Sequence, residues 1–302
     1  MSTAGMAKTP TKSSYDVVIV GGAMMGSSVA WFLSDNPDFN GSVLVVERDP
    51  SYENSSTAHT NSCIRQQFSR DLNVRISRFG AEFINGFKDF MGGDERVPEL
   101  SIQSYGYMYL ADNEGFAQTL RESQAVQAAA GSATKLMTPQ DIKREYPFYN
   151  VDDLVLGSIN LVNEGYWDGG TVFEWWRRSA RERGVEYVSN EVVGMTKNAA
   201  GTRVESVTLK SGQVIACGQV LNASGPRAVE TAKMAGLSVQ DTSTIAIESG
   251  IQNGTLGIAV GGMIAGVATG IPEMALPTHI SLFLNSHCAT LDLALLAIHD
   301  IR

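Results

Sequence analysis

A glycine-rich turn near the start of the chain, between a strand-like run and a helix-like run, constrains the fold most. Residues 15–22 read YDVVIVGG, an apolar, β-branched run ending in glycines, which indicates a buried strand. Residues 24–36 have helical periodicity, and residues 42–49, SVLVVERD, indicate a second strand. A strand, a glycine turn, a helix and a strand within about thirty residues predict a βαβ unit with two parallel strands.

The turn itself has the spacing of a dinucleotide-binding loop, Gly-x-Gly-x-x-Gly, but Ala23 replaces the middle glycine. Gly21 permits a tight turn and Gly26 permits close packing of helix on strand, while the methyl group of Ala23 narrows the approach of a pyrophosphate without abolishing it. Glu47 ends the second strand, where an acidic side chain binds ribose hydroxyls and disfavours a 2′-phosphate. The pattern predicts a cofactor loop, with a purely structural βαβ turn as the alternative.

Charge and cysteine content exclude some classes of function. The net charge of −9 and the lack of a basic run argue against a nucleic-acid partner. Cys63, Cys217 and Cys288 match no metal spacing, so we expect no metal site and a reducing compartment. Residues 1–14 are polar, without the apolar core of a secretory signal, and are predicted to be a flexible tail. A cytoplasmic location follows.

Several further elements can be predicted from local patterns. Residues 73–91 form one amphipathic helix, residues 185–195 one strand, and residues 203–217 a hairpin that turns at a Ser-Gly pair. Thr138, directly before Pro139, is a predicted helix N-cap. The polar segment between the second strand and the long helix is predicted to be a functional loop.

Five segments together resemble one enzyme family. They are DVVIVGGAMMGSSVAWFL, SVLVVERD, SSTAHTNSCIRQQFS, EGYWDGGTVFEWWRRSARERGVEYVSNEVVGM and VLNASGPRAVETAKMAGL, in this order. The set resembles the FAD-dependent amine and amino-acid oxidoreductases, the superfamily of D-amino acid oxidase, sarcosine oxidase, glycine oxidase and dimethylglycine dehydrogenase, over residues 15–237. The resemblance implies an α/β fold, with a Rossmann-like FAD-binding domain and partial strands of a β-rich substrate domain near residues 97–165.

The resemblance also implies which residues contact FAD. Those facing the pyrophosphate are the turn residues Gly21, Gly22, Ala23, Met25 and Gly26. Those at the adenosine ribose are Glu47 and Arg48, and those at the pyrophosphate and ribityl oxygens are Ser55, Ser56 and Thr57. The backbone of Val192 would meet the adenine, and the turn that closes over the dinucleotide is made of Ala223, Ser224 and Gly225.

Four further residues of the polar loop are candidates for the flavin or substrate. His59 lies close to where dimethylglycine-dehydrogenase relatives carry a histidine joined covalently to flavin; the alternative is an exposed loop histidine. Arg65 lies where a cation would hold the flavin or a substrate carboxylate, and its alternative is an ion pair with a surface acid. Gln66 and Gln67 share these two interpretations.

The last part of the chain has a different composition. Residues 249–272 carry no charged side chain and are long enough to span a membrane, although they are rich in glycine and lack basic flanks. Residues 243–285 resemble part of a bile acid/sodium symporter around Glu248 and Gln252. We therefore expect residues 238–302 to be an apolar tail unrelated to the oxidoreductase family, with possible membrane contact, and the substrate domain to be incomplete.

By resemblance, the chemistry is hydride transfer from the Cα–H of a small amine or N-methyl amino acid to FAD, followed by hydrolysis of the imine. Oxygen and another electron carrier both stay open as acceptor, and no residue has an assigned catalytic role. The alternatives are a nicotinamide-dependent dehydrogenase and a non-catalytic chimeric fragment with a membrane-associating tail.

Overall fold

The computed structural model describes residues 6–238, which belong to two compact units. Unit 1 comprises Met1–Thr60 and Gly169–Arg302, and unit 2 comprises Asn61–Asp168. Beyond Ser238, the predicted apolar tail, including the stretch expected to resemble a symporter, lies outside the described residues. Within residues 6–238, no helix is both long enough and apolar enough to cross a membrane. The domain boundaries expected from the sequence stay predictions.

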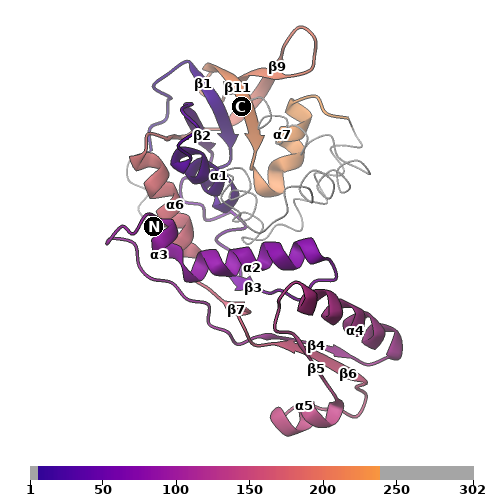
Figure 1. The fold of residues 1–302 in the computed structure, drawn as a ribbon. Coiled ribbons are helices and arrows are strands. Elements are labelled where there is room, and N and C mark those ends of the chain that lie inside the picture. The colour runs from indigo at the N-terminus through magenta and orange to yellow at the C-terminus, as the bar shows by residue number, and fades with distance from the viewer. Residues whose placement is uncertain (1–5, 239–302) are drawn as a thin grey trace. The chain divides into compact units, whose positions relative to one another are not determined.

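Unit 1 is built on a six-stranded mixed sheet (Figure 1). The strand order is β8 (Glu186–Ser189), β2 (Val43–Glu47), β1 (Ser14–Val20), β11 (Val214–Asn222), β10 (Val204–Leu209), β9 (Val192–Lys197). The first four strands are parallel, and β10 is antiparallel to both of its neighbours. The predicted βαβ unit and the predicted hairpin are both confirmed, because each depends on a local pattern of apolar runs and turn residues.

The expectation of one strand over residues 185–195 is wrong. The chain forms two strands there, β8 and β9, which stand at opposite ends of the strand order and are joined by Asn190 and Glu191 alone. The sheet therefore curls, and buried side chains of both strands, Val188 and Val192, pack in the same hydrophobic cluster. Asn190 holds the corner, because its side-chain amide donates to the carbonyl of Lys8 at 2.7 Å.

Two helices pack together in unit 1. They are α1 (Met24–Asp35) and α6 (Gly169–Glu182), followed later in the chain by η1 (Gly225–Arg227) and α7 (Ala228–Met234). The indole rings of Trp31 on α1 and Trp176 on α6 stack with their centroids 6.3 Å apart, and both side chains are buried. Phe173, on the same helix, is also buried.

Unit 2 contains two small sheets and four helices among the residues described. The three-stranded antiparallel sheet has the order β4 (Tyr107–Ala111), β6 (Leu156–Asn160), β5 (Lys135–Met137). The two-stranded sheet pairs β3 (Cys63–Ile64) with β7 (Gly165–Tyr166). The helices are α2 (Asp71–Asn85), α3 (Phe87–Phe90), α4 (Glu114–Ala129) and α5 (Pro139–Glu145).

The helix boundaries in unit 2 show which local sequence signals are sufficient to predict where a helix begins or ends. Thr138 caps α5 as predicted, since its side chain accepts from the amide of Asp141, whose carboxylate in turn accepts from the amide of Thr138. The single helix expected over residues 73–91 is instead divided at Gly86 into α2 and α3. Glycine weakens a helix interior, and here it separates two helical segments.

Gly26 determines how closely α1 approaches the preceding turn. A Cβ atom at residue 26 would lie 1.9 Å from the carbonyl oxygen of Gly21, so the helix could not keep its place with a side chain here. We expect G26A to lower the free energy of unfolding by about 3 kcal/mol, the upper range for overpacking. Urea unfolding followed by circular dichroism measures the change.

The matched control is G115A in the first turn of α4. A Cβ there would meet only the side-chain oxygen of Asn113, at 3.3 Å, so G115A should leave the free energy of unfolding nearly unchanged. Equal stability of G26A and the wild-type protein would contradict the packing role of Gly26.

Candidate functional site

The first turn brings the predicted residues Gly21 and Ala223 together. Gly21 has a φ of 98°, and its amide donates to the carbonyl of Val46 at 2.9 Å, which ties the turn to β2. A Cβ at residue 21 would lie 2.4 Å from the carbonyl oxygen of Ala223. The amide of Ala223 donates to the carbonyl of Val20 at 2.9 Å. The turns that follow the two neighbouring strands, β1 and β11, are therefore in backbone contact, and glycine alone fits at residue 21.

The N-terminus of α1 is open to an anion. Ala23 is the N-cap and provides no side-chain hydrogen bond, and the first turn carries no acidic residue. Met25 and Gly26 lie in this first turn, where an amide has no acceptor within the helix. Thr57, from the predicted second loop, accepts from the amide of Met24 at 3.1 Å. The loop thus reaches the same helix end, where the helix dipole favours negative charge.

The rest of the second loop is held by local turns. The hydroxyl of Ser55 donates to the carbonyl of Tyr52 at 2.7 Å and accepts from the amide of Ala58 at 3.2 Å. The carbonyl of Ser56 accepts from the amide of His59 at 3.2 Å, and the His59 side chain is exposed. Exposure leaves both interpretations of His59 open, and its covalent link to flavin stays a prediction.

Glu47 is a buried carboxylate beside the turn. One oxygen accepts from the amide of Gly22 and the other from the amide of Asp49, each at 2.7 Å, while only 9% of the residue is exposed. Burial raises the pKa of the Glu47 carboxyl from its ordinary value of 4.5, and the two amide donors oppose that rise. Each oxygen keeps a further lone pair, so the carboxylate can also accept from a pair of hydroxyls.

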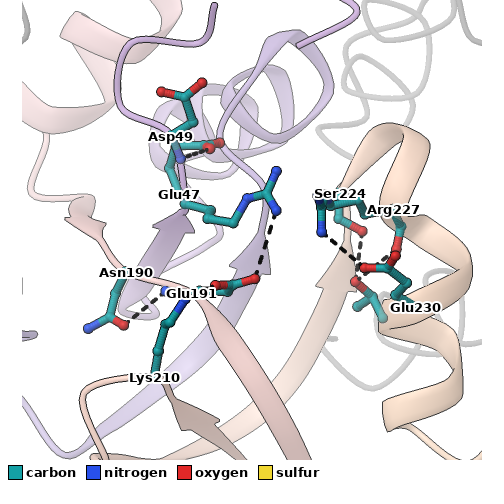
Figure 2. A network of polar contacts seen from close by, with 10 residues as sticks. Glu47, Asp49, Asn190, Glu191, Lys210, Ser224, Arg227 and Glu230 are labelled. Atoms are coloured by element: carbon teal, nitrogen blue, oxygen red, sulfur yellow. Dashed lines mark hydrogen bonds and ion pairs between the residues drawn. The ribbon is translucent and has the colours of Figure 1, made fainter. Parts of the chain in front are cut away.

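An ion pair links the end of β2 to the start of β9. Glu191 lies 3.9 Å from the guanidinium of Arg48 and 2.9 Å from the ammonium of Lys210 (Figure 2). Val192, the predicted adenine contact, is the next residue and is buried in the core. The structure therefore brings the predicted ribose and adenine segments together through Glu191, a residue that the sequence analysis did not single out.

The third predicted loop continues into a short helical turn. Ser224 donates through its hydroxyl to the side-chain oxygen of Asn222 at 2.7 Å, and its hydroxyl is 2.8 Å from that of Thr231 (Figure 2). Gly225, with a φ of 55°, begins η1. Arg227, at the end of η1, pairs with Glu230 at 3.2 Å. These bonds fix the loop, and none of them uses the backbone amide of Gly225.

Tyr52 is a second residue that sequence reasoning missed. It is 2% exposed, and its hydroxyl would lie 3.2 Å from a Cβ at Gly22. Within the described part of the chain, this hydroxyl has no acceptor for its proton, and the guanidinium of Arg177 is a close electrostatic neighbour. Burial raises its pKa to about 12, so it is a neutral donor at physiological pH. No sequence signal marks it, because a tyrosine in a polar loop gives no indication of burial.

In unit 2, the predicted residues Arg65, Gln66 and Gln67 have different environments. Arg65 is exposed; its guanidinium contacts the hydroxyl of Tyr109 and lies 4.8 Å from the centre of the Phe68 ring. No carboxylate of the described residues is within ion-pair distance of it, so the surface ion pair offered as an alternative is absent there. Gln66 and Gln67 are buried and bond to Glu164.

The residues of unit 1 fit the adenosine and pyrophosphate parts of a dinucleotide. Three observations support the fit: the crowded backbone at Gly21, the uncapped N-terminus of α1, and the unused donor of Tyr52 beside the turn. Glu47 adds an acceptor for a ribose diol at the end of the adjacent strand. Among residues 6–238, no group of three or more histidine, cysteine or acidic side chains could hold a metal ion.

Comparison with known proteins gives the family. Residues 16–250 match the family model described as DAO, FAD dependent oxidoreductase. The chain belongs to this family. The match runs past residue 237, where the resemblance seen in the sequence ended.

Relatives within the FAD-dependent oxidoreductase family include two named proteins. FAD-dependent oxidoreductase domain-containing protein 1 from Xenopus laevis is 33% identical over 250 residues, covering 76% of this chain and 50% of that protein. The mitochondrial sarcosine dehydrogenase of Mus musculus is 25% identical over 235 residues, covering 76% and 24% respectively. The chain thus spans about half the length, or less, of these curated relatives.

Solved structures support the same fold. L-proline dehydrogenase from P. horikoshii superposes with a TM-score of 0.62 at 25% identity, covering 76% of this chain and 57% of that one. Glycine oxidase from Geobacillus kaustophilus superposes with a TM-score of 0.60 at 17% identity, covering 76% and 60%. The second likeness concerns the fold alone.

The raised pKa of Glu47 makes a prediction about stability. Because the folded state binds the Glu47 proton more tightly than the unfolded chain, the folded state holds more protons between pH 4.5 and its own higher pKa. The free energy of unfolding of the wild-type protein, minus that of E47Q, should therefore increase as the pH falls from 7.5 to 5. Urea unfolding of the FAD-free proteins across this range measures the difference. If this difference in the free energy of unfolding instead decreased on acidification, burial would not be raising the pKa of Glu47.

Proposed function

We propose that this chain binds FAD and takes part in the oxidation of the C–N bond of a small amine or amino acid. The observation that carries the proposal is the meeting of three features in unit 1: the Gly21 turn, the open N-terminus of α1 and the buried Glu47. The relatives named sarcosine dehydrogenase and L-proline dehydrogenase favour a small substrate.

Each proposed role follows from where the residue lies, in the glycine turn, at a strand end or in a loop. The amides at Ala23, Met25 and Gly26 bind the pyrophosphate beside the Gly21–Gly22 turn, with Thr57 ordering the helix end and Ser55 and Ser56 in the same loop. Glu47 and Arg48 hold the ribose, Val192 meets the adenine, and the loop of Ala223, Ser224 and Gly225 covers the dinucleotide. When bound, FAD supplies the two-electron oxidant for the substrate Cα–H.

Arg65 is proposed to hold the carboxylate of an amino-acid substrate. A guanidinium presents two parallel N–H donors to a carboxylate, and the exposed Arg65 has no carboxylate of the described residues within ion-pair distance. The contact with the Tyr109 hydroxyl and the Phe68 ring restricts the side chain before a substrate arrives, which lowers the entropic cost of binding.

FAD binding tests the cofactor proposal directly. The purified protein should show flavin absorbance, and E47Q should weaken FAD affinity about tenfold or more, because hydrogen bonds to a charged acceptor contribute about 1.5–3 kcal/mol. Fluorescence titration of the apoprotein with FAD measures the dissociation constants. E53Q, which changes an exposed carboxylate of the same loop, is the matched control and should bind like wild type.

Two results would contradict this proposal: failure of the wild-type protein to bind FAD, or equal affinity of E47Q and wild type. Acid precipitation of the same sample should release the flavin to the supernatant. Flavin that stays in the precipitate, and is lost in the H59A variant, would instead assign a covalent link to His59.

The Arg65 proposal predicts a loss of selectivity for carboxylates. Sarcosine and dimethylamine share the N-methyl amine, but only sarcosine carries a carboxylate. R65Q should lower the ratio of their kcat/KM values about a hundredfold, the effect of losing about 3 kcal/mol of charge-assisted bonding. R75Q, on the exposed face of α2, should leave the ratio unchanged. Oxygen uptake and dye reduction, measured in parallel, separate an oxidase from a dehydrogenase.

A further inference from the structure

Arg65 is attached to one short segment of unit 2 through both of its chain neighbours. On one side, Ile64 pairs with Gly165 in the two-stranded sheet. On the other side, the amide of Gln66 donates to the side chain of Glu164 at 2.6 Å. Arg65 itself follows the last residue of β3 and has no partner in the ladder. Two consecutive residues, Glu164 and Gly165, therefore bracket the backbone of Arg65.

Glu164 is a fully buried carboxylate, 0% exposed, and every bond to it comes from a donor. One oxygen accepts from the amide of Gln66 and from the side-chain amide of Asn160 at 3.0 Å. The other oxygen accepts from the side-chain amide of Gln67 at 3.0 Å. A carboxylate satisfies three donors without conflict, whereas a protonated or amide side chain would present a donor to one of them.

Gln67 extends this arrangement to the strand that contacts Arg65. Its side-chain nitrogen also donates to the carbonyl of Tyr107 at 2.9 Å, and its side-chain oxygen accepts from the hydroxyl of Ser158 at 2.9 Å. Tyr107 begins β4, and Tyr109, two residues further along the same strand, provides the hydroxyl at the Arg65 guanidinium. The backbone of Arg65 and the hydroxyl that its side chain contacts are thus both connected to Glu164.

We infer that Glu164 is the positioning residue for Arg65: its buried carboxylate fixes the Gln66–Gln67 backbone so that the guanidinium stays at Tyr109 and Phe68, ready for a substrate carboxylate. The inference rests on the role proposed for Arg65. It assigns a function to a buried acid that neither cofactor binding nor the chemistry of oxidation requires.

The electrostatics of unit 2 agree with this assignment. Burial raises the pKa of the Glu164 carboxyl above its ordinary value, and the three donors together with the charge of Arg65 oppose the rise. A buried charge is costly, and replacing its network by apolar side chains is often neutral or stabilising. The stability of the fold alone therefore does not explain an ionised carboxylate at Glu164. Orientation of the neighbouring Arg65 guanidinium does explain it.

The variant E164Q tests whether the Glu164 side chain positions Arg65 through its hydrogen bonds or only fills space in the core. Its side-chain oxygen can keep both Gln66 and Asn160, while its new nitrogen meets the nitrogen of Gln67, so one link fails and the volume is conserved. The readout is the Nε–H signal of Arg65 in the full chain labelled with ¹⁵N-arginine, assigned by its absence in R65K. In the wild-type protein, the Phe68 ring should shift this signal away from those of other exposed arginines.

We expect E164Q to move the Arg65 signal at least halfway to the position of mobile arginines and to leave the other arginine signals in place. E122Q removes an exposed acceptor from Gln118 on α4 and should leave the Arg65 signal unchanged.

Two outcomes would overturn the inference. An unmoved Arg65 signal in E164Q would show that Glu164 does not position Arg65. Displacement of all arginine signals together would show that Glu164 has a general structural role only.

Kinetics with sarcosine and L-proline add a second measurement. In E164Q, KM should rise about tenfold and kcat should stay within about threefold of wild type, because the orientation of the bound carboxylate and not the chemical step is affected. An unchanged KM would count against positioning. Should the wild-type protein oxidise neither substrate, the proposed function fails, whereas the Arg65 signal still decides the role of Glu164.

Discussion

The close approach of the Gly21 peptide to its neighbours is the constraint on which unit 1 depends. Its α-carbon faces the carbonyl of Ala223 after β11, its amide is bonded to β2, and its own carbonyl leaves no room for a side chain at Gly26 of α1. One residue therefore sets the spacing of three strands and one helix. The same crowding excludes side chains from the surface where a pyrophosphate would meet the backbone, so the packing of the fold and the shape of the candidate site have a common cause.

Local patterns predicted what depends on neighbours in sequence. The βαβ unit, the hairpin and the Thr138 cap each lie within a few tens of residues and follow from periodicity and turn chemistry. The break at Gly86 and the corner at Asn190 were missed, because helical periodicity continues through Gly86 and strand-forming residues flank Asn190 on both sides. At Asn190, hydrogen bonding to Lys8, on a segment distant in sequence, outweighs the strand propensity of the flanking residues.

The candidate site was predictable in part for the same reason. Glycines and an acid at set spacing indicated the Gly21 turn and Glu47, since that chemistry is contained in one supersecondary unit. Glu164 gave no signal, because its partners Gln66 and Gln67 lie 98 and 97 residues away in sequence. Glu191 similarly pairs with Arg48 from the connection between β8 and β9, 143 residues further along the chain. Acidic residues that position basic side chains do so through tertiary contacts, which a single sequence does not reveal.

The short pairing of β3 with β7 has a topological consequence. Cys63 pairs with Tyr166, and the amide of Trp167 donates to the carbonyl of Ser62 at 2.9 Å, so the first and last residues of unit 2 are adjacent. Unit 2 is thus an insertion whose two ends coincide, and unit 1 is completed by chain segments on either side of it. An insertion of this kind adds little loop-closure entropy to the host fold, and its length and content can change while the host sheet keeps its register. In evolution, such a segment can be exchanged to alter what an enzyme recognises without rebuilding the part that holds its cofactor.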